Sequence, residues 1–307
     1  MWRRNLYAAW LSQILSITGF GFVLPFIPFY IQELGVTDPD QLRLWTGVLA
    51  GAPALSMALM APVWGIIADR VGKKLMMLRA MLFGAIIVSL MSTARSPEMV
   101  LVLRIAQGLF TGTVTASGAL VATGTPKERL SYALGFLSSA TFIGVSLGPM
   151  VGGFAGEWLG YRSSFLIGGA MLAIGFVLVL TLVKETNASP GQKRETASDE
   201  RDVRKSDGKE SPAAGGGPTP LRPQLAKFLS RSMLGLFALI MVLRFVRPLP
   251  VPFLPLYVQE LRGQLAGSAT ATGLISAGRG AVTALAAITI VRLGDRHSRS
   301  LLIGILL

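Results

Sequence analysis

Residues Gly65–Lys74 read G-I-I-A-D-R-V-G-K-K, a charged segment that lies between two long apolar stretches. A weaker copy recurs near the end of the chain, at Asp295, Arg296 and Arg299. A charged loop that recurs between helices of membrane length predicts that the chain is built from two structurally equivalent halves.

Most of the chain is too apolar to form the surface of a soluble domain. Hydrophobic residues make up 51% of it and charged residues only 15%. A hydrocarbon core of about 30 Å is crossed by about 20 helical residues. Stretches of that length lie at residues 7–31, 45–68, 75–94, 99–122, 132–154, 163–183, 233–258 and 269–291. The sequence therefore predicts an all-α, polytopic membrane protein.

Basic residues are concentrated in alternate connections between these stretches. They stand at Arg3 and Arg4, at Arg70, Lys73 and Lys74, at Lys127 and Arg129, after Lys184, and at Arg292, Arg296 and Arg299. Positively charged connections favour the cytoplasmic side, which predicts a cytoplasmic N-terminus. This distribution accounts for the net charge of +13 without a nucleic-acid partner.

The domain organisation follows from one long polar segment. Residues 187–228 are rich in Gly, Pro, Ser and charged side chains, which predicts a flexible cytoplasmic linker. We expect residues 1–186 to form a six-helix half. We expect residues 229–307 to form an incomplete second half, with helices seven and eight and the start of a ninth at Ser300, and therefore a truncated chain.

Residues of the first half reappear in the second half in the same order. Pro25, Pro28, Tyr30, Gln32, Glu33 and Leu34 recur as Pro252, Pro255, Tyr257, Gln259, Glu260 and Leu261. Two halves with the same order and orientation predict a parallel-repeat transporter.

Three groups of residues resemble the sequence motifs of a known family. The loop signature called motif A is matched by Gly65, Asp69, Arg70, Gly72, Lys73 and Lys74. Three residues resemble motif B: Arg104, Gln107 and Gly108. Five residues resemble the antiporter motif C: Gly144, Gly148, Pro149, Gly152 and Gly153. With its opening W-x-x-N-L, the chain resembles drug:proton antiporters of the major facilitator superfamily, in particular the MdtG-like multidrug resistance proteins.

The resemblance implies roles for these motifs. Asp69 would latch one conformation through a helix of the second half, and motif C would imply exchange of substrate against an ion. Arg104 would lie near the proton pathway, with Gln13 and Gln107 as hydrogen-bonding partners. Simpler interpretations stay open: motif A fixes topology, motif C provides small-residue packing, and Arg104 satisfies backbone carbonyls.

Three arginines of the second half lie within predicted helices and have no carboxylate at comparable depth. They are Arg244, Arg247 and Arg279, and the repeat places Ile17, Phe20 and Leu24 on the matching face of the first helix. These residues could line a substrate cavity for an anionic or zwitterionic compound. Alternatively, the arginines pair with carboxylates beyond Leu307.

We therefore expect a secondary active transporter that works by alternating access and exports drugs, with a preference for anionic or amphipathic compounds, in exchange for protons. An uptake transporter or facilitator for a small metabolite is the alternative, and a non-transporting sensor is the second. We expect a monomer in the bacterial inner membrane, with no cofactor. Enzyme chemistry has no support, since His297 is the only histidine, no catalytic residues are apparent and cysteine is absent.

Overall fold

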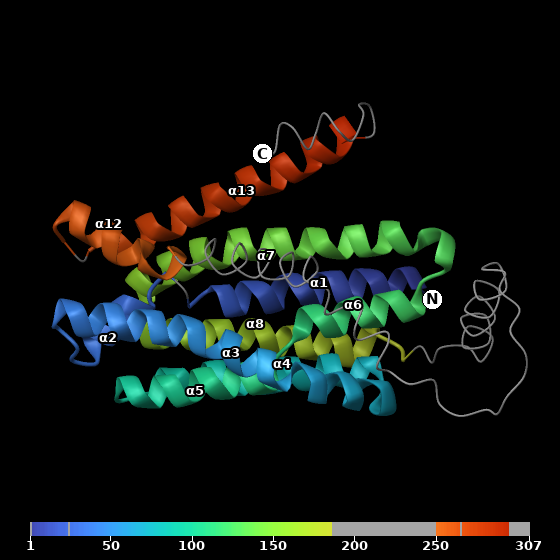
Figure 1. Ribbon diagram of the computed structural model, residues 1–307, viewed down its shortest axis with the longest axis horizontal. Coiled ribbons are helices and arrows are strands. Elements are labelled where there is room, and N and C mark those ends of the chain that lie inside the picture. Colours follow the sequence, from blue (N-terminus) through green and yellow to red (C-terminus); the bar gives the residue numbers. More distant parts are fainter. Residues whose placement is uncertain (1, 24, 186–249, 265, 295–307) are drawn as a thin grey trace, which may run out of the picture. The chain divides into compact units, whose positions relative to one another are not determined.

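The computed structural model describes residues 2–23, 25–185, 250–264 and 266–294 (Figure 1). The helices from Pro252 onward belong to one compact unit with those before Asn187. Within these described residues the chain forms helices and no strand, which confirms the predicted all-α class. The predicted boundaries at residues 186–187 and 228–229 fall outside the described part.

The first predicted span is two helices instead of one. Helix α1 covers Trp2–Gly21 and the short helix α2 covers Ile27–Glu33. Pro25 and Pro28 explain the interruption, because proline lacks an N–H and disfavours a helical conformation in the residue before it. Pro28 lies in the first turn of α2, where the missing N–H is harmless.

Four of the next spans are continuous helices. They are α3 (Pro39–Val71), α4 (Lys73–Leu90, followed by the 3-10 turn η1 at Met91–Thr93), α7 (Leu130–Leu159) and α8 (Tyr161–Leu182). Asp38 begins α3, since its side chain accepts the N–H of Asp40 at 3.0 Å.

The predicted fourth span is interrupted near its middle. Helix α5 covers Pro97–Phe110 and α6 covers Thr113–Gly124, and the 3-10 turn η2 (Lys127–Arg129) leads into α7. Gly112 lies in the break with φ +132°, a conformation that favours glycine. The indole N–H of Trp64 donates to the Leu109 carbonyl at 2.7 Å, which satisfies a carbonyl in the last turn of α5. The sequence pattern did not indicate this break.

The described part of the second half begins with the 3-10 turn η3 (Val251–Phe253) and α12 (Leu254–Arg262). Helix α13 (Ser268–Gly294) contains the whole of the predicted eighth span. Most of the predicted seventh span and the start of the ninth lie outside the described residues.

Five helical segments of the described residues are long and apolar enough to cross a membrane. They cover Pro39–Ala68, Lys73–Thr93, Pro97–Gly124, Lys127–Leu159 and Tyr161–Leu182. These segments confirm the polytopic character that the composition predicts.

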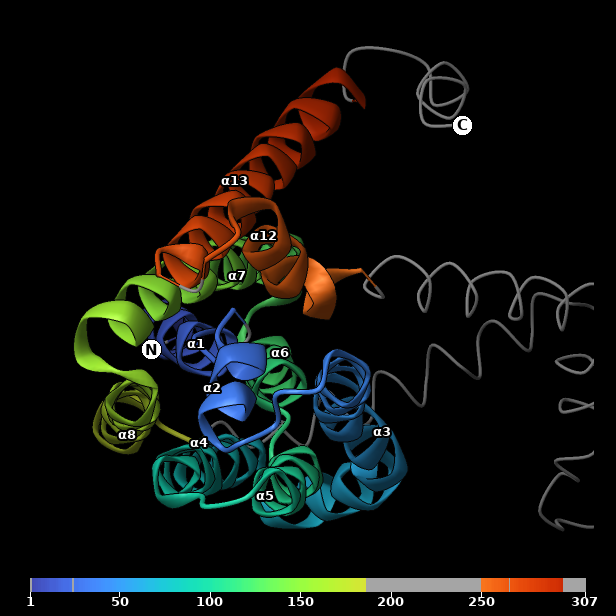
Figure 2. The same cartoon turned by 90° about the vertical axis from the view of Figure 1, so that its left-hand side faces the viewer.

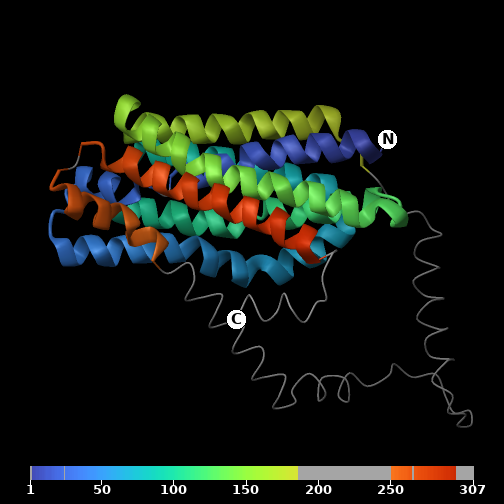
Figure 3. The same cartoon turned by 90° about the horizontal axis from the view of Figure 1, so that it is seen from above.

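Helix α1 is surrounded on several sides by other helices of the first half. It packs against α7, α8 and α6, and Figure 2 shows these helices around it. One apolar core, with Phe22, Tyr30 and Phe165, fills the end of the bundle opposite the N-terminus. A second core, with Leu6, Met77 and Leu137, fills the N-terminal end. Figure 3 shows α2 and α12 at the end opposite the N-terminus, which we call the distal end.

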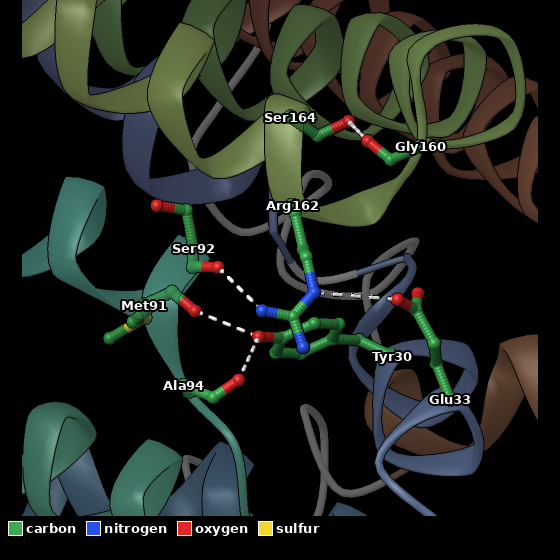
Figure 4. A network of polar contacts seen from close by, with 8 residues as sticks. All are labelled: Tyr30, Glu33, Met91, Ser92, Ala94, Gly160, Arg162 and Ser164. Atoms are coloured by element: carbon green, nitrogen blue, oxygen red, sulfur yellow. Dashed lines mark hydrogen bonds and ion pairs between the residues drawn. The ribbon is translucent and has the colours of Figure 1, made fainter.

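A polar network holds the first half together at the distal end (Figure 4). The Tyr30 hydroxyl donates to the carbonyls of Met91 at 2.9 Å and Ala94 at 3.3 Å. Arg162 donates to the Ser92 carbonyl at 3.1 Å and pairs with Glu33 at 3.5 Å. These contacts join α2, η1 and α8, so the ends of the first, third and sixth spans are fixed relative to one another.

Candidate functional site

The loop between α3 and α4 carries the motif A residues and is closed by a carboxylate from the end of α8. Glu185 accepts the backbone N–H of Lys73 at 3.0 Å and of Lys74 at 3.4 Å. The Lys74 ammonium donates to the Leu180 carbonyl at 3.0 Å. Gly72 turns the chain between the helices with φ +101°, and these contacts anchor the start of α4 to α8.

Sequence reasoning missed Glu185, because its partners are more than 100 positions away and no local pattern links them. A second contact at this end involves Asn5 of the W-x-x-N-L segment. Its side chain donates to the Lys184 carbonyl at 2.9 Å and accepts the Lys184 N–H at 3.1 Å. The starts of α1 and α4 are therefore both tied to the end of α8.

The predicted latch at motif A stays a prediction. Gly65 and Arg70 lie in the last turns of α3, and outside the neighbouring backbone of this helix no described atom lies within 4 Å of the position a Gly65 Cβ would take. The side chain of Asp69 is outside the described part of the structure. The corresponding residues of the second half, Asp295, Arg296 and Arg299, also lie outside it.

Arg104 of α5 is buried in the bundle and only partly satisfied. It is 4% exposed, and its Nη1 donates to the Gln107 side chain at 3.0 Å. Nε and Nη2 have no hydrogen-bond partner among the described residues. Gln107 is thus the partner that the sequence predicted, one turn along the same helix.

Gln13 has a different partner from the predicted one. It is fully buried on α1, and its side-chain oxygen accepts the Ser117 hydroxyl of α6 at 2.9 Å. Its amide nitrogen and the hydroxyls of Ser12, Ser16 and Thr18 have no partner within the described chain. Buried polar atoms without partners are costly, so the Gln13 amide can donate a hydrogen bond to water or to a substrate, and the three hydroxyls can donate or accept one.

The hydroxyl residues had a sequence signal that we did not use. Ser12 and Ser16 are four positions apart in an apolar helix and therefore lie on one face.

Arg79 of α4 was missed as well, although it stands within the third predicted span. Its guanidinium lies 3.4 Å from the ring centre of Trp64, and its Nε and Nη1 lack partners in the described structure.

The motif C glycines of α7 form two close helix contacts. Gly144 lies against Ile17, Gly148 against Gly21 and Gly152 against Phe22, all on the α1 side. On the other side, Gly153 lies against Ala269, and the Pro149 carbonyl lies against Gly273 of α13. Motif C thus provides packing between α1, α7 and the second half.

The predicted cavity residues are only partly described. Ile17 packs against Gly144 of α7, and Phe20 lies against Gly84 of α4. Arg279 is exposed on α13. Leu24, Arg244 and Arg247 lie outside the described residues, so a cavity wall built from all six stays a prediction.

Two polar contacts connect the halves at the distal end. Gln32 of α2 and Gln259 of α12 exchange side-chain hydrogen bonds of 3.0 and 3.3 Å. Glu157, at the end of α7, accepts the Ala269 N–H at 3.0 Å and the Thr270 hydroxyl. A carboxylate is favourable at the start of α13, where the helix N–H groups are free.

We expect Glu157→Ala to open the distal end between α7 and α13. The chain has no cysteine, so a single Ala269→Cys reports access to the buried start of α13. Contacts of this kind contribute about 0.3–2 kcal/mol, so labelling by a polar thiol reagent should become about two- to thirtyfold faster. Glu98→Ala, at an exposed carboxylate of the same end, is the control. Equal labelling rates in the two variants would contradict the role of Glu157.

The sequence of the chain is similar to a family of membrane transporters. A model of the Major Facilitator Superfamily matches residues 9–307. The multidrug resistance protein MdtG of Proteus mirabilis is 33% identical over 295 residues, which cover 96% of this chain and 68% of the relative. MdtG of Escherichia fergusonii is 35% identical over 296 residues, with 96% and 67% covered. The chain therefore spans about two thirds of the length of these relatives.

Solved structures share the fold. A bacterial homologue of the human lysosomal transporter Spinster, in an inward-facing and unoccupied conformation, has a TM-score of 0.71 at 17% identity, covering 97% of this chain and 63% of that one. The human organic anion transporter MFSD10 has a TM-score of 0.54 at 22% identity, covering 60% and 48%.

Proposed function

Because the chain belongs to the Major Facilitator Superfamily, we propose that it expels amphipathic drugs from the cell in exchange for protons. It is a multi-pass membrane protein of a transporter family and not an enzyme. We place its N-terminus in the cytoplasm and its distal end at the outer face of a bacterial inner membrane. The similarity to multidrug resistance proteins supports drug export.

The buried Arg104 is the observation that carries this proposal. Placing a cation inside a helical membrane bundle costs free energy, so such residues are rare and often mark a substrate, ion or proton pathway. Arg104 keeps two buried nitrogens free of partners in the described structure, and Gln13 and Ser117 supply further polar atoms in the same bundle. The free nitrogens of Arg104 can bind water or an acidic group, which supports a role for Arg104 on the proposed proton pathway.

Alternating access is supported by the position of the contacts between the halves. The Gln32–Gln259 pair and the Glu157–α13 contact both lie at the distal end. When they are formed, the proposed outer gate is closed. In the opposite state these contacts would separate, while motif A would hold the cytoplasmic end through Asp69.

The proposed preference for anionic or amphipathic compounds rests on charge. Every carboxylate of the described residues lies near the end of a span, whereas Arg104 and Arg79 lie within spans. A buried cation without a paired carboxylate favours an anion or the electron-rich face of an aromatic compound. Arg279, and Arg244 and Arg247 beyond the described part, would add to this preference. We propose that one chain transports as a monomer.

Everted membrane vesicles that express the protein test the coupling. Respiration acidifies their interior, and addition of a transported drug should then release protons and partly collapse the pH gradient. The collapse should saturate with drug concentration and be absent from vesicles without the protein. Drug accumulation that is insensitive to an uncoupler would contradict proton exchange. Increased uptake of the compound by intact cells would instead indicate the metabolite importer.

A further inference from the structure

A cavity of about 290 Å³ opens at the N-terminal end of the bundle, between the start of α1 and the start of α7. The residues that line it are Trp2, Arg3, Leu6, Tyr7, Arg129 and Tyr132. Trp2 and Leu6 belong to the W-x-x-N-L segment, but none of the six belongs to motifs A, B or C or to the predicted substrate cavity. The cavity therefore needs its own explanation.

The charge of this cavity comes from two arginines on different helices. Arg3 and Arg129 are both exposed, and within the described part of the chain neither forms an ion pair. The Arg3 guanidinium lies 5.5 Å from the ring centre of Trp2. Glu128 is adjacent in sequence, but it does not line the cavity. The cavity is thus a two-arginine site that matches an anion.

The wall of the cavity toward the membrane interior is aromatic and aliphatic. Tyr7 and Tyr132 are 55% and 57% exposed, and their rings lie 5.6 and 6.2 Å from the ring of Phe136. Leu11 continues the exposed surface one turn further along α1. Exposed tyrosines are typical of the level of the lipid headgroups. The site therefore changes from cationic to aromatic to aliphatic with depth.

We infer that this cavity binds an anionic phospholipid, with the headgroup phosphate between Arg3 and Arg129 and an acyl chain along Tyr7, Tyr132 and Leu11. A lipid carries its phosphate outside its hydrocarbon, and in the same order the two arginines of the cavity are followed along the helices by Tyr7 and Tyr132, with Leu11 beyond the cavity. A basic pocket between helices at a membrane surface fits a lipid headgroup of this kind. The bound lipid would bridge α1 and α7. This inference does not depend on the transported substrate.

Titration of the detergent-purified protein with phosphatidylglycerol, followed by native mass spectrometry, tests the site. The double variant Arg3→Gln/Arg129→Gln should bind about tenfold more weakly, which is equivalent to about 1.4 kcal/mol. Arg3→Lys/Arg129→Lys keeps the charge and should retain most of the binding. Arg43→Gln/Arg95→Gln removes two charges at the distal end and should leave the binding of phosphatidylglycerol unchanged.

Phosphatidylethanolamine and glycerol 3-phosphate distinguish the sources of the phosphate. The inference requires that the zwitterionic lipid binds more weakly than phosphatidylglycerol, and that glycerol 3-phosphate, which lacks acyl chains, does not displace it at equal concentration. Equal affinity of the Arg3/Arg129 and Arg43/Arg95 glutamine variants would overturn the site. Displacement by glycerol 3-phosphate would also overturn it, in favour of a free-phosphate site.

Discussion

Arg104→Met should lower drug transport by about tenfold or more without lowering the stability of the protein, where tenfold is equivalent to about 1.4 kcal/mol. Transport is expected to fall because the buried guanidinium, with two nitrogens free of partners in the described structure, is the proposed polar centre of the bundle. The variant is expected to be as stable as the unsubstituted protein or more stable, because a buried charge that lacks a carboxylate partner costs free energy. Everted vesicles report the transport, and the melting temperature in detergent reports the stability.

Two further variants make this test specific. Arg104→Lys keeps a charge but loses the planar donor group, so it should restore transport only in part. Arg95→Met removes an exposed arginine near the distal end and should change neither property. If Arg104→Met transported normally, the guanidinium would have no part in transport. If it unfolded the protein, Arg104 would be a structural residue.

Much of the fold could be predicted from the sequence. The lengths of the apolar stretches located α3, α4, α7, α8 and α13, because a membrane fixes the length of a spanning helix. The two interruptions were not located. Pro25 could have indicated the break after α1. At Gly112 a single glycine was the only local signal, and the Trp64 contact that satisfies the Leu109 carbonyl beside the break is formed only in the folded bundle.

The candidate site was predictable where chemistry is local. The pairing of Arg104 with Gln107 follows from their spacing of three positions on one helix. Glu185 and Glu157 could not be predicted in this way, since each binds the start of a helix more than 100 positions away in sequence. Gln13 was placed beside Arg104, yet Ser117 of α6 is the partner that the packing brings to it.

The second large effect is expected at Gly152, where α7 packs against Phe22, the residue directly after α1. A Cβ there would lie 2.7 Å from the Phe22 carbonyl carbon and closer still to its oxygen. The backbones of the two helices must then move apart, and we expect Gly152→Ala to lower the unfolding free energy by about 1–3 kcal/mol. Thermal unfolding in detergent measures the change.

Gly135→Ala on the same helix is the matched control. Outside the neighbouring backbone of α7, no described atom lies within 4 Å of a Cβ at Gly135. Alanine should therefore be neutral there or stabilise the helix by up to about 1 kcal/mol, through its higher helix propensity. The two substitutions add the same methyl group to α7, and only the one at Gly152 meets a neighbouring backbone. If both variants unfolded at the same temperature, the motif C glycines would serve some role other than close packing against α1.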